Sequence, residues 1–440
     1  MLKKIISFFV FALLCFLLYL ALKLLFSFFP ADIQISNTVL SLSNAIGFGI
    51  AFTFFLFGIT YGWLWTKETV RSGGKKFLLI TISILFSMVI FPILILLIED
   101  ANNLYNYIVS DNVYSVIGIP YVPDDTLGLK HIPNSLGAQS IPYYGKIIPM
   151  HSSKEGFRVP VSDSTSLDAN GHADVIFFGC SFTYGHGILA EEAFPYVVAK
   201  QDSLSYINAG VCSYGLSQMD ILANRLIPKY KPKYVVIQYS PWLIQRSLCL
   251  FSPNGLVVLT NPYFCKNGDN ISILPPVYVV QAFQDKGELR EKYEGNYLSF
   301  VFKVGIPYCE NNFFHIISVK IKQAWNPLLR PATDADAVEK YIYNDMVRVA
   351  TENGAQVIIL NLGDQEYSQR SKSLFDTKYN VRFAEADSML SDYLEKSVTK
   401  DFRKEFGILG FNGQDSVYAD PHPNAKAHKI IAKSILLKLK

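Results

Sequence analysis

Three long apolar runs in the first hundred residues constrain this chain more than any other feature. They cover residues 5–29, 45–65 and 77–98, and only Lys23 interrupts the first of them. A helix needs roughly 20 apolar residues to cross a hydrocarbon core of about 30 Å. No Asp, Glu or His lies within the runs to mark a path for ions or substrate. We therefore predict three transmembrane helices that form a membrane anchor over residues 1–100.

The first run also permits a second interpretation, as a cleaved signal peptide, because Lys3 and Lys4 precede it. However, the run is longer than the apolar part of a typical signal peptide. No clear small-x-small cleavage pattern follows it, and two more apolar runs come next. These features favour a retained membrane helix.

The positive charges around the runs predict their orientation, because Lys and Arg gather in cytoplasmic loops. Lys3 and Lys4 precede the first run, and the loop between the first two runs has no Lys or Arg. The loop between the second and third runs is basic and contains Lys67, Arg71, Lys75 and Lys76. With three spans, everything after residue 100 lies outside the cytoplasm. We expect a multi-pass protein of the cell membrane whose soluble part is periplasmic or at the cell surface.

The overall charge gives no sign of a nucleic-acid partner. The 440 residues have a formal net charge of +3 and contain no dense basic stripe. A length of 440 residues also suggests more than one domain. After the anchor, residues 101–172 are rich in Pro, Gly, Asn and Tyr. We predict an irregular lead-in with short strands there, packed on a catalytic domain over residues 173–440.

Strands and helices alternate through residues 173–440. The predicted strands are residues 174–178, 205–209, 234–239, 356–362 and 381–384. The predicted helices are residues 191–200, 217–227, 334–353 and 424–440, with Pro228 ending the second. This alternation is typical of an α/β domain with a parallel sheet, in which ligands lie at the carboxyl ends of the strands. An aromatic-rich insertion over 243–334 interrupts the pattern, and we expect it to cover or border the site.

A serine stands at the end of the first strand of this domain. The buried segment 174–178 runs directly into Gly179-Cys180-Ser181. A serine on a tight turn after a strand holds its hydroxyl out toward a substrate carbonyl. Small neighbours let that substrate reach backbone N–H groups that can stabilise an oxyanion. The alternative is an ordinary strand-to-helix turn with a serine cap.

A second candidate segment lies near the C-terminus, at Asp420-Pro-His422-Pro. The two prolines predict a rigid loop before a helix that starts near Asn424. A serine hydroxyl needs a base to take its proton, and His422 has a carboxylate two residues away that could orient it. The alternative is a simple helix N-cap. Of the other histidines, His428 fits packing or the surface, and His186 either touches substrate or has no special role.

Together, the segments Gly179-Cys-Ser181-Phe-Thr-Tyr-Gly and Asp420-Pro-His422 resemble the SGNH, or GDSL-like, serine hydrolase superfamily. The resemblance covers roughly residues 173–242 and 335–440. It implies a three-layer α/β/α flavodoxin-like fold and acyl transfer from esters without a cofactor or metal. It assigns Ser181 as nucleophile, His422 as base and Asp420 as the orienting acid.

The same resemblance implies an oxyanion hole built from the serine N–H, a glycine of a second block and an asparagine of a third. The second block here begins at Asn208, and we place its glycine at Gly215, with Ser213 as the alternative alignment. The third block reads Gln238-Tyr-Ser240-Pro-Trp and lacks the asparagine. Gln238, Ser240 or the insertion could supply a replacement. Loss of one oxyanion donor can cost about 100-fold in rate.

The cysteines leave several alternatives open. Cys180 next to the serine is a second candidate nucleophile, although the resemblance favours Ser181. Outside the cytoplasm disulfides are permitted, and Cys265 could pair with Cys249 or with Cys309. The spacings match no zinc-binding pattern.

These features together predict a membrane-anchored, extracytoplasmic serine esterase. The expected partners are the lipid bilayer and an acylated glycan or lipid ester substrate. Two alternatives remain at this point. One is an O-acyltransferase that modifies a surface polysaccharide, and the other is a non-catalytic scaffold with the same fold that lost its oxyanion hole.

Overall fold

The computed structural model describes residues 101, 105, 115–117, 121–140, 147–248, 251–254, 257–268, 270–276, 286–305, 322, 325–329, 332–363, 365–411 and 416–439. The three predicted spans lie outside these residues. Within the part that is described, no helix is both long and apolar enough to span a bilayer. The chain forms two compact units, residues 1–106 with 295–314 and residues 107–294 with 315–440.

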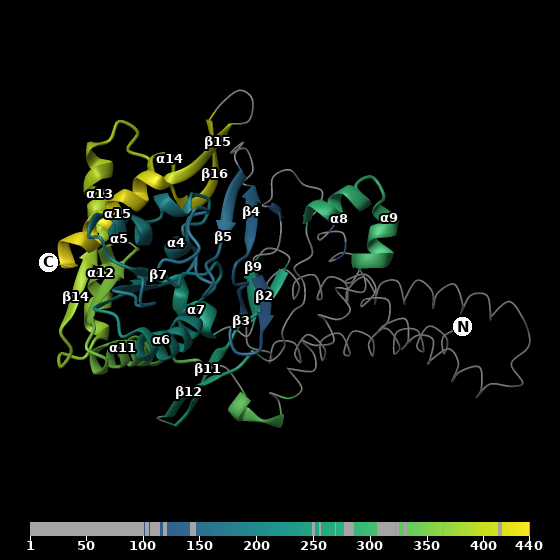
Figure 1. The fold of residues 1–440 in the computed structure, drawn as a ribbon. Coiled ribbons are helices and arrows are strands. Elements are labelled where there is room, and N and C mark those ends of the chain that lie inside the picture. Colours follow the sequence, from purple (N-terminus) through teal and green to yellow (C-terminus); the bar gives the residue numbers. More distant parts are fainter. Residues whose placement is uncertain are drawn as a thin grey trace, which may run out of the picture. The chain divides into compact units, whose positions relative to one another are not determined.

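A five-stranded parallel sheet forms the centre of the second unit (Figure 1). Its strands are β6 (Val175–Phe178), β7 (Tyr206–Asn208), β8 (Tyr234–Tyr239), β13 (Gln356–Asn361) and β14 (Val381–Glu385). They lie in the order β14-β13-β8-β6-β7, and every neighbouring pair is parallel. Numbered along the chain, this order is 2-1-3-4-5, which is flavodoxin-like. The predicted α/β class and parallel sheet are therefore confirmed.

Helices cover both faces of this sheet and make three layers. Among the helices that contribute to the two cores are α5 (Phe194–Gln201), α6 (Leu216–Tyr230), α11 (Ala335–Glu352), α13 (Ala386–Lys396) and α15 (Ala425–Leu439). Helices α6 and α11 contribute to one core, and α5, α13 and α15 contribute to the other.

Strand β6 shows how the two cores form. Ile176 and Phe178 belong to one core, and Val175 and Phe177 belong to the other. Successive side chains of a strand point to opposite faces, so a strand that is buried on both sides is apolar at every position. Together with helix α12 (Gln365–Leu374), these elements complete the α/β/α body.

Helix α6 continues through Pro228 to Tyr230, so the predicted end at Pro228 is wrong. Pro228 lies in the last turn, where its ring costs only one late backbone hydrogen bond. The residue after Tyr230, Lys231, caps the helix: its backbone is left-handed with a φ of 44°, and its N–H donates to the carbonyl of Ile227.

The segment Asp420–Pro423, predicted as a loop, is also corrected. It is the end of strand β16 (Ser416–Pro423), which pairs antiparallel with β15 (Gly407–Phe411) and follows the short helix α14 (Phe402–Phe406). The register shifts on both sides of Ile408. Prolines are tolerated in edge strands and near such irregularities, because no regular ladder needs their missing N–H.

The described part of the lead-in contains five short strands that pair antiparallel, followed by turns over residues 152–172. The strands are β1 (Ser115–Ile117), β2 (Tyr121–Asp124), β3 (Gly128–His131), β4 (Leu136–Ser140) and β5 (Ile147–His151). Strand β4 pairs with both β1 and β5, and β2 pairs with β3. A small core joins this lead-in to the α/β body, in which the Tyr214 hydroxyl donates to the carbonyl of Leu129 over 2.6 Å.

The insertion leaves the sheet after β8. Its elements are α7 (Trp242–Leu248), β9 (Phe251–Asn254), β10 (Val257–Thr260), β11 (Tyr263–Asn267), β12 (Asn270–Leu274), α8 (Lys286–Tyr293), α9 (Tyr297–Phe300), the π-helical turn η2 (Val301–Gly305) and the 3-10 turn η3 (Pro327–Leu329). The segment 295–314 groups with residues 1–106, so the insertion contributes to both compact units. A role as cover for the site stays a prediction.

Cys265 on β11 is a buried cysteine with no disulfide to any described residue. Its Sγ donates to the carbonyl oxygen of Leu328 over 2.8 Å. Cys249 and Cys309, the candidate disulfide partners of Cys265, lie outside the described residues, so the pairing stays a prediction.

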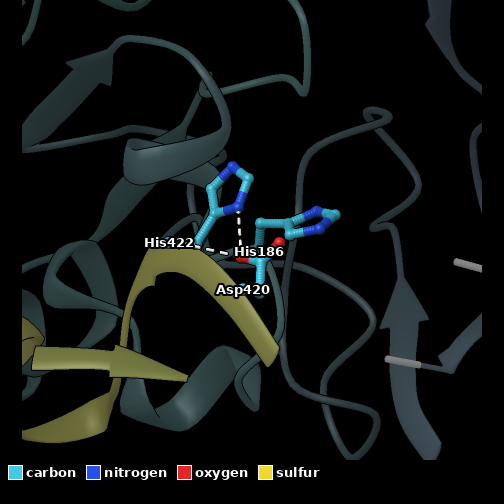
Figure 2. Close-up of side chains that lie close together, drawn as sticks. All are labelled: His186, Asp420 and His422. Carbon is cyan, nitrogen blue, oxygen red and sulfur yellow. Dashed lines mark hydrogen bonds and ion pairs between the residues drawn. The ribbon is translucent and has the colours of Figure 1, made fainter. Parts of the chain in front are cut away.

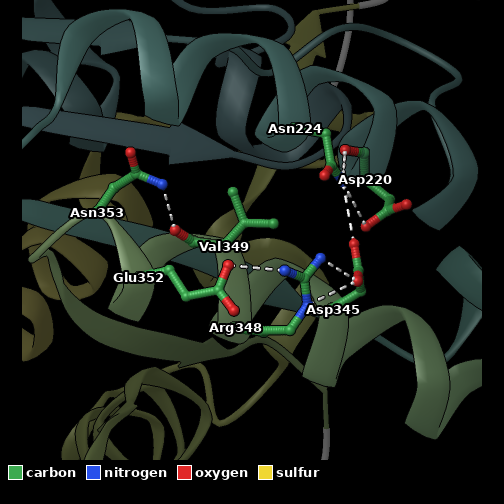
Figure 3. A network of polar contacts seen from close by, with 7 residues as sticks. All are labelled: Asp220, Asn224, Asp345, Arg348, Val349, Glu352 and Asn353. Atoms are coloured by element: carbon green, nitrogen blue, oxygen red, sulfur yellow. Dashed lines mark hydrogen bonds and ion pairs between the residues drawn. The ribbon is translucent and has the colours of Figure 1, made fainter.

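Helices α6 and α11 are joined by a polar network (Figure 3). Asn224 Nδ2 donates to Asp345 Oδ2 over 3.0 Å and to Asp220 Oδ1 over 3.4 Å. Arg348 binds Asp345 and Glu352, each at 2.7 Å. Burial of Asp220, together with the neighbouring carboxylate of Asp345, raises the pKa of Asp220 well above its usual value.

Candidate active site

Ser181 is the first residue of a one-turn helix, α4 (Ser181–Tyr184), directly after strand β6 and the turn Gly179-Cys180. A Cβ atom on Gly179 would lie 1.9 Å from Thr183 Oγ1, so only glycine fits there. Gly185 ends the turn with a φ of 80°, a left-handed conformation that favours glycine. The two glycines therefore permit the sharp change from strand to helix at the serine.

The structure brings Ser181, His422 and Asp420 together. His422 Nε2 lies 2.8 Å from Ser181 Oγ, and His422 Nδ1 lies 2.5 Å from Asp420 Oδ1. The same Asp420 oxygen accepts the backbone N–H of His422 over 2.8 Å. An ionised carboxylate only accepts, so the ring proton belongs on Nδ1 and Nε2 is left to accept from the serine hydroxyl. This is the arrangement of a nucleophile, a base and an orienting acid.

Aromatic side chains surround the base. The ring of Phe182 meets His422 edge-on with centroids 5.4 Å apart. Trp242 packs on Phe182 at 5.0 Å, and both of these rings are half-buried. We call Phe182 and Trp242 the aromatic wall. Trp242 belongs to the third block, where the resemblance calls for an asparagine.

Gln238 supports the serine turn from inside the protein. Its Oε1 accepts from the Cys180 N–H over 3.1 Å and from Thr183 Oγ1 over 2.8 Å. Its Nε2 donates to Ser240 Oγ over 2.9 Å, and Ser240 in turn donates to the carbonyl of Leu362. Both Gln238 and Ser240 are fully buried. These bonds use their polar groups, so neither fits the suggested replacement for the missing oxyanion donor.

Gly215 has a local role at the start of helix α6. Its N–H donates to Gln218 Oε1 over 3.0 Å. A Cβ at this position would lie 2.7 Å from Arg246 Cβ and 2.9 Å from the Leu243 carbonyl oxygen. The alternative residue, Ser213, is buried and has a left-handed φ of 71°, the conformation that favours glycine. The geometry thus favours Ser213 over Gly215 as the counterpart of the oxyanion glycine.

His186 lies against the base. Its ring centroid is 4.2 Å from that of His422, with the planes at 40° (Figure 2). Gln139 Nε2 lies 2.6 Å from His186 Nε2, and Cys212 Sγ lies 3.4 Å from His186 Nδ1. Burial and, after it, the nearby His422 hold the pKa of His186 well below its usual value. Gln139 comes from the lead-in strand β4, and nothing in the sequence marks it as part of the site.

Among the described residues, His186, Asp420 and His422 also form the one group of His, Cys, Asp and Glu side chains that could hold a metal ion. Their ligand atoms lie within 4.8 Å of one another. However, both ring nitrogens of His422 are already hydrogen-bonded to Asp420 and Ser181. This donor set fits acid–base chemistry on Ser181 better than it fits metal coordination.

Arg158 is a further residue that the sequence did not single out. It is buried, and its guanidinium donates to the carbonyls of Gly185 and Ile188 over 2.8 and 2.6 Å. It also lies over the Tyr184 ring at 4.2 Å from the centroid. Arg158 therefore fixes the loop that follows the serine helix and that carries His186.

Two alternatives from the sequence find a structural role instead. His428 is buried on α15 and accepts the Phe194 N–H at Nδ1 over 3.0 Å, while burial lowers its pKa to about 3. Cys180 is fully buried beneath the serine, where its N–H and Sγ face Gln238. Both positions suit packing rather than contact with a substrate.

No family model matches this chain, and no curated protein matches its sequence. A search of solved structures finds distant likenesses. A protein assigned to the G-D-S-L family of lipolytic proteins, from Desulfitobacterium hafniense DCB-2, is 13% identical with a TM-score of 0.28, and the match covers 60% of this chain and 97% of that one. TesA is 14% identical with a TM-score of 0.26 over 60% and 97%. A protein from Bacteroides fragilis NCTC 9343 described as an acylhydrolase is 13% identical with a TM-score of 0.27 over 62% and 88%. Likeness at this level does not bear on the activity, which rests on the geometry of the site.

Proposed function

We propose that this protein is a membrane-anchored, extracytoplasmic serine esterase that acts through an acyl-enzyme. The observation that carries the proposal is the hydrogen-bonded chain Ser181–His422–Asp420, with 2.8 Å from hydroxyl to imidazole and 2.5 Å from imidazole to carboxylate. Structural serines rarely need such a chain, whereas a serine nucleophile requires one.

The reaction follows from the positions of these three groups. His422 Nε2 takes the proton of Ser181 as Oγ attacks the ester carbonyl, and Asp420 stabilises the imidazolium that forms. His422 then returns the proton to the departing alcohol, which leaves an acyl group on Ser181. A water molecule then attacks the acyl carbonyl as His422 takes its proton, and His422 passes that proton to Ser181 Oγ as the bond to the acyl group breaks and the acid leaves.

The aromatic wall supports a substrate with an apolar or ring-shaped surface. Phe182 contacts His422 directly, and Trp242 extends this apolar surface by packing on Phe182. Half-buried aromatic faces bind acyl chains by burial of apolar area and sugar rings by stacking. An acylated glycan or a lipid ester would meet these requirements.

The location is proposed from the sequence. The apolar runs at 5–29, 45–65 and 77–98 are long enough to anchor the chain in the bilayer, and the basic loops orient the catalytic domain outward. A reporter fused after residue 110 that is active only in the periplasm or at the surface supports this topology. Activity of a cytoplasm-only reporter at the same junction contradicts it.

The non-catalytic alternative has one observation in its favour. Gln238 and Ser240 are both engaged in supporting the serine turn, so neither of these two candidates from the third block is left to act as the oxyanion donor. Loss of the oxyanion donor that the asparagine would supply lowers the rate by about 100-fold but does not change the type of reaction. The intact triad argues for catalysis over a scaffold.

The direct test is covalent labelling of the full chain, purified in detergent, with a fluorophosphonate probe. We expect labelling of the wild type and of Ser162→Ala, whose serine is exposed, but none of Ser181→Ala. Likewise, the wild type and Ser162→Ala should hydrolyse p-nitrophenyl acetate, and Ser181→Ala should not. Equal labelling and equal hydrolysis in all three proteins would end the esterase proposal. Addition of a glycan acceptor, followed by mass analysis for an acylated product, separates hydrolysis from acyl transfer to a surface polysaccharide.

A further inference from the structure

His186 is the residue near the triad that the esterase mechanism leaves without a role. Its ring packs on the ring of His422, the proposed base, at a centroid distance of 4.2 Å. A second imidazole so close to the base matters, because a cation at that position would oppose the positive charge that His422 gains in the reaction.

The contacts of His186 with Gln139 determine which protonation state fits. Gly187 donates its N–H to Gln139 Oε1 over 3.3 Å, which fixes the orientation of the amide. Gln139 Nε2, a group that only donates, therefore faces His186, at 3.0 Å from Nδ1 and 2.6 Å from Nε2. An imidazolium carries a hydrogen on both nitrogens and cannot accept. One ring nitrogen must therefore be unprotonated, and the ring is neutral.

The other groups facing His186 agree with a neutral ring. Cys212 Sγ lies 3.4 Å from Nδ1, and burial raises the pKa of this thiol to about 11, so it gives no negative charge near neutral pH. Arg158 is a buried cation that also disfavours a charged His186. A carboxylate oxygen of Asp420 lies within 4.8 Å of a His186 ring nitrogen, but this carboxylate accepts hydrogen bonds from the ring and the backbone N–H of His422.

From these contacts we propose that His186 is a positioning residue for the base, held uncharged by the amide of Gln139 so that it packs on His422 without opposing its protonation. This inference rests on the proposed function, since it assigns His422 the part of base. It also gives the lead-in a part in the site, because strand β4 supplies Gln139.

A substitution that changes only the amide of Gln139 to a carboxylate tests the proposal. Gln139→Glu replaces the donor by an acceptor, so His186 should become charged through the neutral range. The pH dependence of the fluorophosphonate labelling rate reports the protonation of His422. We expect the acid limb of this profile to move down by about one pH unit and the rate at pH 7.5 to fall about tenfold, because a like charge disfavours protonated His422. The new carboxylate offsets part of the effect.

Three variants serve as matched controls. Gln139→Met keeps the length of the side chain without any charge and should leave the acid limb in place. His186→Phe keeps a ring against His422 and should also leave it in place. In the double variant Gln139→Glu, His186→Phe there is no imidazole to charge and only the new carboxylate remains, so the limb should lie at or above its position in His186→Phe and not below it. A double variant that keeps the shift, or a Gln139→Glu profile identical to that of the wild type, overturns the proposal.

A second measurement is independent of activity. NMR of the full chain with 15N-labelled histidine gives the chemical shifts of the ring nitrogens, and the signals lost in His186→Phe are those of His186. We expect these shifts to be those of a neutral imidazole at pH 7 in the wild type and those of an imidazolium in Gln139→Glu. A charged ring in the wild type overturns the inference even if the esterase is active. A wild type that shows a neutral His186 but never labels would instead count against the proposed function alone.

Discussion

Ser181 Oγ and His422 Nε2 lie 2.8 Å apart although 241 positions separate the two residues in the chain. Two elements produce this proximity: Ser181 follows strand β6 of the parallel sheet directly, and the separate β15–β16 hairpin places His422 beside α4. Asp420, two residues before His422 on the same strand, contacts both its ring and its backbone N–H. The base and its orienting acid thus come from one short, proline-bounded segment.

The role of Asp420 predicts a large effect of Asp420→Asn on the rate. An amide can donate to Nδ1, which favours the tautomer with its proton on Nε2, where it can no longer accept from Ser181. We expect the rate of p-nitrophenyl acetate hydrolysis to fall by about a thousandfold or more, as for comparable triads. Asp163→Asn, a change at a half-buried aspartate away from the triad, should match the wild type. An Asp420→Asn enzyme within threefold of the wild type would contradict the triad.

Gln238 predicts a coupled loss of stability and activity. Gln238→Leu removes the acceptor for the Cys180 N–H and for Thr183 Oγ1 at once. Each buried donor left without a partner costs about 1–3 kcal/mol. We expect the free energy of unfolding in urea to fall by about 3 kcal/mol, and the labelling rate of Ser181 to fall in the molecules that stay folded. Thr183→Val removes only one of the two bonds and should show about half the loss of stability. Equal stability in the wild type and Gln238→Leu would show that this support is dispensable.

The sequence predicts most of the α/β body because its strands and helices follow local patterns. The apolar segment before Gly179 must be a buried strand, and the spacing in residues 334–353 is that of an amphipathic helix. The triad residues are also predictable, since a serine after a buried strand and a histidine near a carboxylate form a recognisable pair. Which polar groups are engaged elsewhere, such as Gln238 Oε1 with Cys180 and Thr183, depends on contacts between distant segments and shows no local pattern.

The residues that support the candidate site could not be predicted from the sequence. Gln139 is an ordinary glutamine in a short strand, and it gains its role only when the lead-in packs beside Gly187 and His186. Arg158 likewise looks like a surface cation, yet it is buried and binds the carbonyls of Gly185 and Ile188. Such contacts join residues 27 to 48 positions apart, beyond the reach of helix or strand periodicity.

Asp220 predicts how stability depends on pH. Its pKa is raised in the folded state, so the folded protein binds a proton more tightly than the unfolded chain, whose Asp titrates near 4. The stabilisation from this proton is fully present below about pH 4 and is lost as the pH rises through the folded pKa. Asp220→Asn keeps an oxygen to accept from Asn224 and carries no charge. We therefore expect its stability relative to the wild type to increase from pH 4 to pH 8.

Thermal unfolding midpoints of the wild type, Asp220→Asn and Asp163→Asn over this pH range give the measurement. The amount by which the unfolding midpoint of Asp220→Asn exceeds that of the wild type should grow with pH. The midpoint of Asp163→Asn should keep a constant difference from that of the wild type at every pH. A constant difference for Asp220→Asn at every pH would mean that Asp220 titrates alike in the folded and unfolded chains.

Ser213 and Gly215 lie close together in the chain, and we expect opposite effects on stability when Ser213 is replaced by glycine and when Gly215 is replaced by alanine. Ser213 holds a left-handed φ of 71°, which costs a non-glycine residue roughly 1 kcal/mol or more, so Ser213→Gly should leave stability unchanged or raise it by up to about 1 kcal/mol. Gly215→Ala brings a methyl group to 2.7 Å from Arg246 Cβ and 2.9 Å from a backbone oxygen, so helix α7 must shift and stability should fall by about 1–3 kcal/mol. If the Ser213 N–H supplies an oxyanion donor, Ser213→Gly keeps that N–H and retains full esterase activity. Urea unfolding of each variant, alongside p-nitrophenyl acetate hydrolysis, separates these effects. A Ser213→Gly protein that unfolds like the wild type but hydrolyses ester far more slowly would show that the serine side chain, and not this N–H, supports the reaction.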